Sequence, residues 1–234
     1  MDRITRKELK TDPFASEVQH TLEYVTDHRS QVVRYGSIAV AVIAIVAAWY
    51  FYSQHQHANR QEKLAEVFRI SDAGVGPSQN PYSLSYPTDD VKDKALVKSL
   101  TELSSQYSGT DEGTIGEYML AAHAADKGNG KEAERRLRDV VDNGKGPYVS
   151  LAAVQLARIY GSAGKVNDAK ALLQPIIDKP TVFVSKEQAE LVLARVVFPT
   201  QPDEARKILD RLRADQRPTI SQTAVSESAE LFAK

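Results

Sequence analysis

The sequence repeats itself at a spacing of 36 residues, and this spacing constrains the fold more than any other feature. The segment that begins at Gly113 and the one that begins at Val149 carry the same residue types in register. The matching pairs are Leu120 and Leu156, Ala121 and Ala157, Gly128 and Gly164, Ala133 and Ala169, and Leu137 and Leu173. In a less regular third copy, Ala205 and Leu209 keep the spacing. A period of this length predicts similar helical units that stack on one another.

Each unit has the pattern of a helix, a turn and a second helix. In the clearest copy, apolar residues recur at helical spacing before and after a turn at 161–164, and Pro180 ends the unit. Alanines recur where the two helices of a unit meet, at positions 121 and 133 in one copy and at 157 and 169 in the next. Such small side chains let two antiparallel helices approach closely, so we expect all four alanines to be buried.

The clearest copy resembles a tetratricopeptide repeat. Its sequence from residue 156 to residue 180 fits the pattern L-A/G-x-x-Y-x-x-x-G-x-x-x-x-A, with matches at Leu156, Ala157, Tyr160, Gly164 and Ala169. The copy at 114–147 fits too, but has Ala124 where the tyrosine usually stands. We therefore predict an all-α fold in which residues 55–234 form a tetratricopeptide-like α-solenoid of antiparallel helix pairs. Its repeats are 114–147, 150–183 and a degenerate 186–218, with a capping helix at 220–234 and a divergent first pair upstream, at 56–74 and 88–107.

A second constraint is the run from Gly36 to Tyr52, which carries no charge and lies between Arg34 and Arg60. At about 1.5 Å per residue, 18 helical residues span about 27 Å, close to the hydrocarbon thickness of a bilayer. An aromatic cluster at 49–52 fits the headgroup region. We predict a single transmembrane helix at 35–54. A buried core helix this apolar would need a large surrounding domain, and no signal-peptide cleavage site follows the run.

Flanking charge predicts the orientation of this span. Six basic residues precede it, whereas only Arg60, Lys63 and Arg69 occur in the first 20 residues after it. The positive-inside rule then places the N-terminus in the cytoplasm and residues 55–234 across the membrane, which is the periplasm in a Gram-negative cell. The predicted location is the bacterial inner membrane. The cytoplasmic arm at 1–34 has an amphipathic helical pattern, with Phe14, Val18 and Leu22 on one face. It either docks on a membrane partner or only caps the span.

Composition argues against several function classes. A net charge of −1 is unlike a nucleic-acid-binding protein, and the sequence has no cysteine, which excludes disulfides and cysteine nucleophiles. We find no Walker, Rossmann, zinc-protease or nucleophile-elbow motif. His55 and His57 have no carboxylate nearby in sequence, so we expect interfacial polar residues there and no metal site. The sequence thus predicts no enzyme activity, no cofactor and no nucleic-acid partner.

The predicted binding surface is the concave face of the solenoid, which the first helix of each pair lines. The repeat pattern places six residues on this face: Tyr118, Ala122, Val154, Arg158, Leu191 and Arg195. Arg158 and Arg195 occupy equivalent positions on successive first helices. Flanked by apolar side chains, they are suited to hold a peptide carboxylate or an acidic segment. The alternative is that they pair with nearby acids such as Asp168 or Glu190.

The whole layout, a short arm, one span and a small translocated repeat domain, resembles the ancillary subunit family of the SecYEG translocon. This resemblance implies a membrane-anchored, chaperone-like adaptor near the secretion channel, which meets other proteins, unfolded peptide segments or periplasmic folding factors. An alternative function is a structural organiser of cell-envelope or division complexes that uses the same repeats. Two further alternatives are an enzyme with a cryptic site and an inverted topology with cytoplasmic repeats.

Overall fold

The computed structural model describes residues 29–77 and 83–232. These residues form nine α-helices and two strands of two residues each, so the predicted all-α class is confirmed. Packing divides the chain into two units, residues 1–58 and 59–234. The predicted amphipathic arm lies, up to residue 28, outside the described residues, as do the last two residues of the predicted cap.

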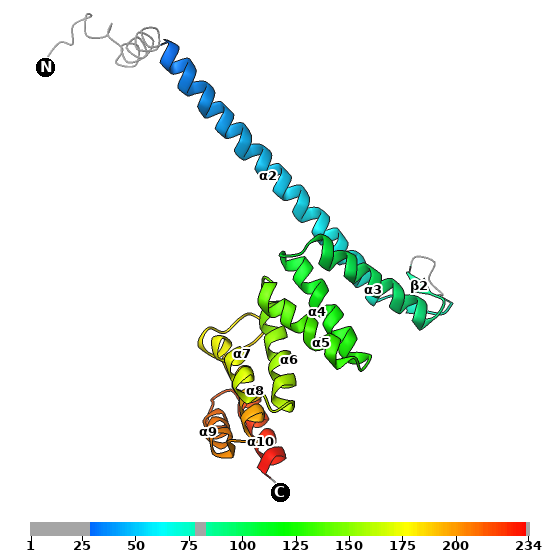
Figure 1. Cartoon of the computed structure of the whole chain (residues 1–234), viewed down its shortest axis with the longest axis vertical. Coiled ribbons are helices and arrows are strands. Elements are labelled where there is room, and N and C mark those ends of the chain that lie inside the picture. The colour runs from blue at the N-terminus through cyan, green and yellow to red at the C-terminus, as the bar shows by residue number, and fades with distance from the viewer. Residues whose placement is uncertain (1–28, 78–82, 233–234) are drawn as a thin grey trace, which may run out of the picture. The chain divides into compact units, whose positions relative to one another are not determined.

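Helix α2 (Arg29–Ser71) contains the whole apolar run. Figure 1 shows it as one continuous helix, coloured blue to cyan. The large apolar side chains between Val33 and Tyr52 are exposed, Trp49 among them. Within the described part of the chain, this is the one helix long and apolar enough to cross a membrane, and none of its most apolar stretch is buried. An uncovered surface of this kind is stable in a membrane and costly in water.

The second unit begins with the C-terminal part of α2 and helix α3 (Asp89–Gln106), whose side chains meet in one apolar cluster. That cluster contains Leu64, Val67, Leu100, Leu103 and Leu120. In this part of α2, Phe68 is 43% exposed, whereas Ile70 is buried. The helix also ends at residue 71 and not at 74.

Two short strands follow α2, and the sequence pattern does not predict them. Strands β1 (Gly74–Val75) and β2 (Ser85–Tyr86) pair in parallel, with Gly74 opposite Ser85 and Val75 opposite Tyr86. Lys92 Nζ on α3 donates a hydrogen bond of 2.6 Å to the carbonyl oxygen of Ala73. This bond fixes the chain just after α2, where the helix leaves carbonyl groups without partners.

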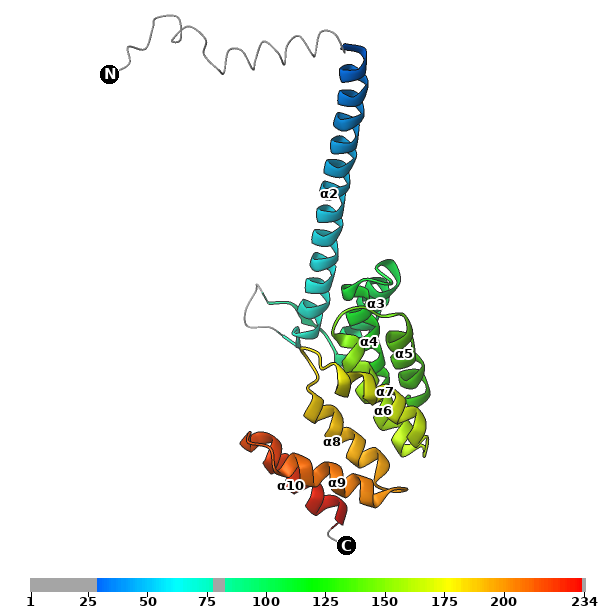
Figure 2. The same ribbon diagram turned by 90° about the vertical axis from the view of Figure 1, so that its left-hand side faces the viewer.

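The remaining helices form antiparallel pairs in chain order, as Figures 1 and 2 show. The pairs are α4 (Asp111–Asp126) with α5 (Gly130–Asn143), α6 (Tyr148–Ser162) with α7 (Val166–Asp178), and α8 (Lys186–Val197) with α9 (Pro202–Arg213), followed by α10 (Pro218–Phe232). The first helices contact one another along the stack: α4 with α6, α6 with α8, and α8 with α10. The first helices therefore form one continuous surface.

The turns explain why glycine recurs at 36-residue spacing. Gly128 and Gly164 have φ angles of +76° and +74°, a left-handed conformation that glycine adopts without strain. The two turns have the same hydrogen-bond pattern. Asn129 N donates to Ala124 O in the first turn and Lys165 N donates to Tyr160 O in the second, both at 2.8 Å. The third pair closes its turn differently, with Pro202 in the first turn of α9.

Close helix packing confirms the role of the small residues. The four alanines at 121, 133, 157 and 169 are buried, with exposed fractions of 0–1%. Gly161 on α6 is equally constrained by α8, because a Cβ atom at Gly161 would lie 2.7 Å from Cγ2 of Val196. The buried alanines thus agree with the predicted contact between the two helices of a unit, and Gly161 lets the first helices α6 and α8 approach closely.

Candidate functional site

The surface of the first helices is hollowed into two neighbouring cavities. The first, of about 410 Å³, lies among α4, α5 and α6 and is bordered by Tyr118, Ala122 and Arg158. The second, of about 590 Å³, lies among α6, α8 and α10 and is bordered by Arg158, Leu191 and Arg195. Most of the surface that lines both cavities is apolar. Because they share Arg158 and Ser162, we describe the two cavities together as the groove.

Five of the six residues placed on this face by sequence line the groove: Tyr118, Ala122, Arg158, Leu191 and Arg195. Val154 does not, because it is only 4% exposed and belongs to the apolar cluster that α6 shares with α8. Val154 lies one helical turn before Arg158, so the two side chains project from the same side of α6. Neighbouring side chains cover Val154 and leave Arg158 exposed.

A row of aromatic rings fixes one border of the groove. The ring of Tyr118 contacts the ring of Tyr148 edge to face, with centroids 5.3 Å apart, and Tyr148 contacts Phe183 in the same way at 5.2 Å. These three residues come from α4, from the start of α6 and from the loop before α8. Next to Phe183, Val182 is 91% exposed. The row holds Tyr118 in place at the groove and carries apolar surface out to the loop.

The two arginines differ sharply in their partners. Arg195 binds Glu227 of α10 through Nη2 at 2.8 Å and Nε at 3.1 Å, and binds Glu230 through Nη2 at 2.8 Å. The hydrogen bond that Arg195 donates to Glu227 is the largest cause of the raised pKa of Arg195, so this side chain stays charged. The alternative prediction, that Arg195 pairs with an acid such as Asp168 or Glu190, named the wrong residues, because its partners are Glu227 and Glu230. Glu190 is buried and pairs instead with Arg211 of α9 at 3.0 Å.

Arg158 has no such partner. Among residues 29–77 and 83–232, no hydrogen bond or ion pair reaches its guanidinium, and the residue is exposed. Asp126 borders the same cavity but forms no ion pair with Arg158 among those residues. The groove therefore presents one available cation in a mostly apolar surface, at the point where its two cavities join.

The groove offers binding groups and few reactive ones. Its charged residues are Asp126, Arg158, Arg195 and Glu227. In the described part of the chain, no three His, Cys, Asp or Glu side chains gather as a metal site would need. His123 on α4 bonds through Nε2 to Asp93 of α3 at 2.7 Å. That contact joins α3 to α4 and lies outside the groove.

Sequence reasoning missed the contribution of α10 to the groove. Glu227 borders the second cavity, and a signal for it exists, because one further 36-residue step from Leu191 reaches Glu227. Ser162, which borders both cavities, was also missed; it lies one helical turn after Arg158. Extending the repeat into the capping helix would have identified Glu227 from the spacing alone.

Comparison with known proteins assigns the family. No curated protein and no solved structure matches this chain. A family model described as a tetratricopeptide repeat-like domain matches residues 33–189, which is more than half of the 234 residues. The match begins in α2 and ends in α8, and so includes the first groove cavity and all of α6. The chain therefore belongs to the tetratricopeptide repeat-like domain family.

Proposed function

We propose that this chain is a membrane-anchored, protein-binding scaffold or chaperone-like adaptor whose groove takes segments of other proteins. The observation that carries the proposal is the groove itself, an exposed and mostly apolar surface formed by the first helices of successive repeats. Apolar concave surfaces with a few polar groups are typical binding sites. Tetratricopeptide repeat-like domains are protein-interaction modules and are typically not catalytic, which agrees with this function.

The anchor in this proposal is the apolar part of α2. What supports it is the exposure of its large apolar side chains, which would be costly in water. The proposed topology has a cytoplasmic N-terminus and periplasmic repeats, in the bacterial inner membrane. Support for this side of the membrane comes from the excess of Lys and Arg before the span.

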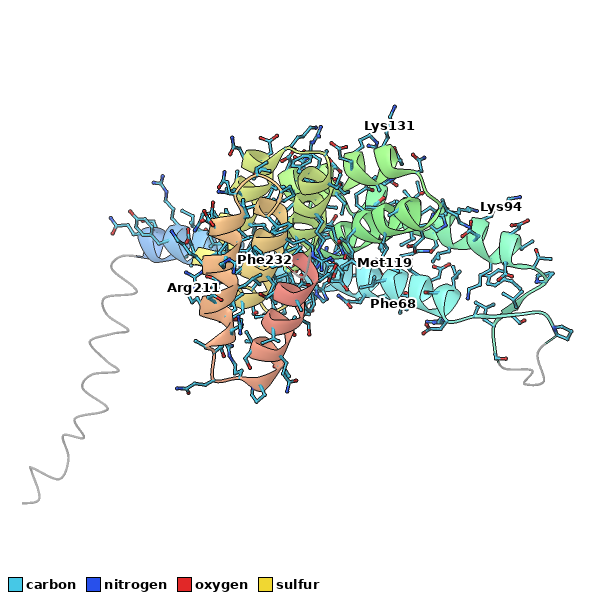
Figure 3. The ribbon with its side chains drawn as sticks, turned by 90° about the horizontal axis from the view of Figure 1, so that it is seen from below. Phe68, Lys94, Met119, Lys131, Arg211 and Phe232 are labelled. Carbon is cyan, nitrogen blue, oxygen red and sulfur yellow. The ribbon has the colours of Figure 1, made fainter. Side chains whose placement is uncertain are left out.

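Photo-crosslinking tests the groove as the binding face. The full chain, in lipid nanodiscs, carries a photo-reactive amino acid at Ala122 in the groove or at Lys131 on α5. The side chain of Lys131 projects away from the helices (Figure 3) and lines neither cavity of the groove. With a reduced and alkylated unfolded polypeptide as probe, we expect adducts from position 122 and not from position 131. Equal adducts from both positions would contradict a groove-based function.

Cysteine labelling tests the anchor and its orientation, because the natural chain has no cysteine. Two variants are compared in spheroplasts, Lys131→Cys in the repeats and Ser16→Cys in the arm, with a maleimide that does not cross membranes. We expect position 131 to react in intact spheroplasts and position 16 only after lysis. The opposite pattern would place the repeats in the cytoplasm.

The finer part of the proposal is that the scaffold acts at the Sec translocon. It rests on the resemblance in layout to the ancillary SecYEG subunit family, with substrates or periplasmic folding factors as the other partners. Crosslinking from residues 1–57 separates this from a structural organiser of envelope or division complexes. If the scaffold acts at the Sec translocon, we expect adducts with SecYEG subunits. Adducts with division or peptidoglycan proteins instead would contradict this role.

A further inference from the structure

The two groove arginines have equivalent places in the repeat but different electrostatic states. Glu227 and Glu230 bring two negative charges to Arg195, so that end of the groove has a surplus of negative charge. Arg158 keeps its full positive charge at the junction of the two cavities. An acidic group that enters the groove is therefore repelled near α10 and attracted to Arg158.

Taking the proposed function as its basis, we infer that the groove selects protein segments in which an acidic side chain is flanked by apolar ones. Arg158 binds the carboxylate, and the two cavities on either side of it take the apolar side chains. Helix α10 keeps Arg195 occupied, so the groove has one acid-binding position and not two.

The chemistry of Arg158 favours a carboxylate as its partner. A guanidinium presents its N–H donors in a planar fork that matches the two oxygens of a carboxylate, and such charge-assisted bonds are stronger than neutral ones. Neighbouring apolar residues, Ala122 in one cavity and Leu191 in the other, lower the local water content when a ligand binds. Removal of water strengthens the ion pair. The binding of the apolar side chains and the binding of the acidic side chain therefore reinforce each other.

Helix α10 provides an internal example of this recognition. Glu227 and Glu230 lie three residues apart, on one face of the helix, and both reach the guanidinium of Arg195. Glu227 binds in the bidentate manner, since its Oε2 accepts from Nε at 3.1 Å and its Oε1 accepts from Nη2 at 2.9 Å. An arginine at this repeat position thus holds a carboxylate carried by a packed helical segment, and the same contact is available at Arg158.

Fluorescence anisotropy with two matched peptides tests the inference. The full chain in lipid nanodiscs is titrated into a fluorescein-labelled peptide of 12 residues that alternates leucine and serine around two central glutamates. The control peptide has glutamine in place of both glutamates. We expect the glutamate peptide to bind about tenfold more tightly, as one charge-assisted contact supports. The substitution Arg158→Gln should abolish that preference.

Two further variants complete the design. Arg69→Gln is the matched control, since Arg69 is exposed on α2 and makes no ion pair within the described residues. We expect it to keep the tenfold preference. The double variant Glu227→Gln, Glu230→Gln frees Arg195 as a second cation in the groove. The preference of this variant for the glutamate peptide over the glutamine peptide should therefore rise about threefold or more. Circular dichroism verifies that α10 remains folded in this variant.

The possible results separate this inference from the proposed function. If the two peptides bind equally and Arg158→Gln changes neither, the acidic preference is overturned while groove binding stands. If neither peptide binds but the unfolded polypeptide still forms adducts at position 122, acid selection is also overturned. A preference that survives Arg158→Gln would overturn the assignment of this residue.

Discussion

Arg195 on α8 and Glu227 on α10 form a bidentate ion pair with nitrogen–oxygen distances of 2.8–3.1 Å. The pair joins the first helix of the third repeat to the capping helix. The Arg195 side chain is 49% exposed, so solvent weakens this pair. We expect Arg195→Ala to lower the free energy of unfolding by less than about 1 kcal/mol. The contact therefore sets the charge of the groove more than it stabilises the fold.

A double-mutant cycle of Arg195→Ala and Glu227→Ala, followed by urea unfolding, measures the coupling. The coupling energy should fall further when the ionic strength is raised to about 1 M, where charges a few ångströms apart are screened. A coupling well above 1 kcal/mol that does not respond to salt would show that the pair is a structural clamp.

The contact between α6 and α8 depends on Gly161. In Gly161→Ala the new methyl group would lie 2.7 Å from Val196 Cγ2 and 3.3 Å from its Cβ, so the helices must move apart. We expect a loss of stability of about 1–3 kcal/mol, typical of overpacking. The matched control is Gly130→Ala, where a Cβ atom meets nothing within 4 Å. It should be neutral or slightly stabilising, because alanine favours helix.

Thermal unfolding followed by circular dichroism checks both glycine variants. Combining Gly161→Ala with Val196→Ala should cost less than the sum of the two single changes, because the second change makes room for the added methyl group. Equal melting temperatures for the two glycine variants would contradict the close approach of these helices.

The buried carboxylate of Glu112 joins α4 to the C-terminal part of α2. Its two oxygens accept hydrogen bonds from Arg60 Nε at 3.1 Å and from Gln61 Nε2 at 2.7 Å, and the residue is only 4% exposed. Removal of Glu112 leaves the guanidinium of Arg60, whose side chain is only 21% exposed, without this carboxylate. We expect Glu112→Ala to cost about 2–4 kcal/mol, measured by urea unfolding of the full chain. A loss within 0.5 kcal/mol, typical of surface sites, would mean that this contact does not stabilise α4 on α2.

Acid should destabilise the repeat domain through a few carboxylates with lowered pKa values. Hydrogen bonds from Arg217 lower the pKa of Asp215 from 3.8 to about 2, and hydrogen bonding to His123 lowers that of Asp93. A carboxylate with a depressed pKa in the folded state stabilises that state above its ordinary pKa. For Asp215 this stability is lost as the pH falls from about 4 to about 2.

The measurement is the melting temperature of the full chain at pH 6 and at pH 3, with Asp215→Asn beside the natural sequence. The natural chain should melt lower at pH 3, and the variant should show a smaller difference because it has no carboxylate to protonate there. An identical pH dependence in both would exclude Asp215 as a contributor.

The sequence predicts the helices and turns well because their physical causes are local. Gly128 and Gly164 are needed at left-handed turns, and the alanines at 157 and 169 are needed where helices touch. These requirements recur in every regular repeat, and therefore appear as spacing. The strands β1 and β2 left no such signal, since strands of two residues contain no periodicity.

The burial and the ion-pair partner of each groove residue were harder to predict. Val154 and Arg158 lie one turn apart on α6, yet one is buried and the other exposed. Which of two such residues becomes covered depends on the packing angle of the neighbouring helix, which spacing does not encode. The partner of Arg195 comes from α10 for the same reason, because ion pairs between helices depend on their relative rotation.

Hydrogen exchange over the whole chain tests the central claim, that the surface of the first helices is the binding face. The protein in nanodiscs is compared with and without the unfolded polypeptide as probe, and exchange of backbone amides is followed by mass spectrometry. We expect slower exchange in α4, α6 and α8, which line the groove, with α7 and α9 unchanged. Slower exchange confined to α7 and α9 would place binding on the opposite face and contradict this claim.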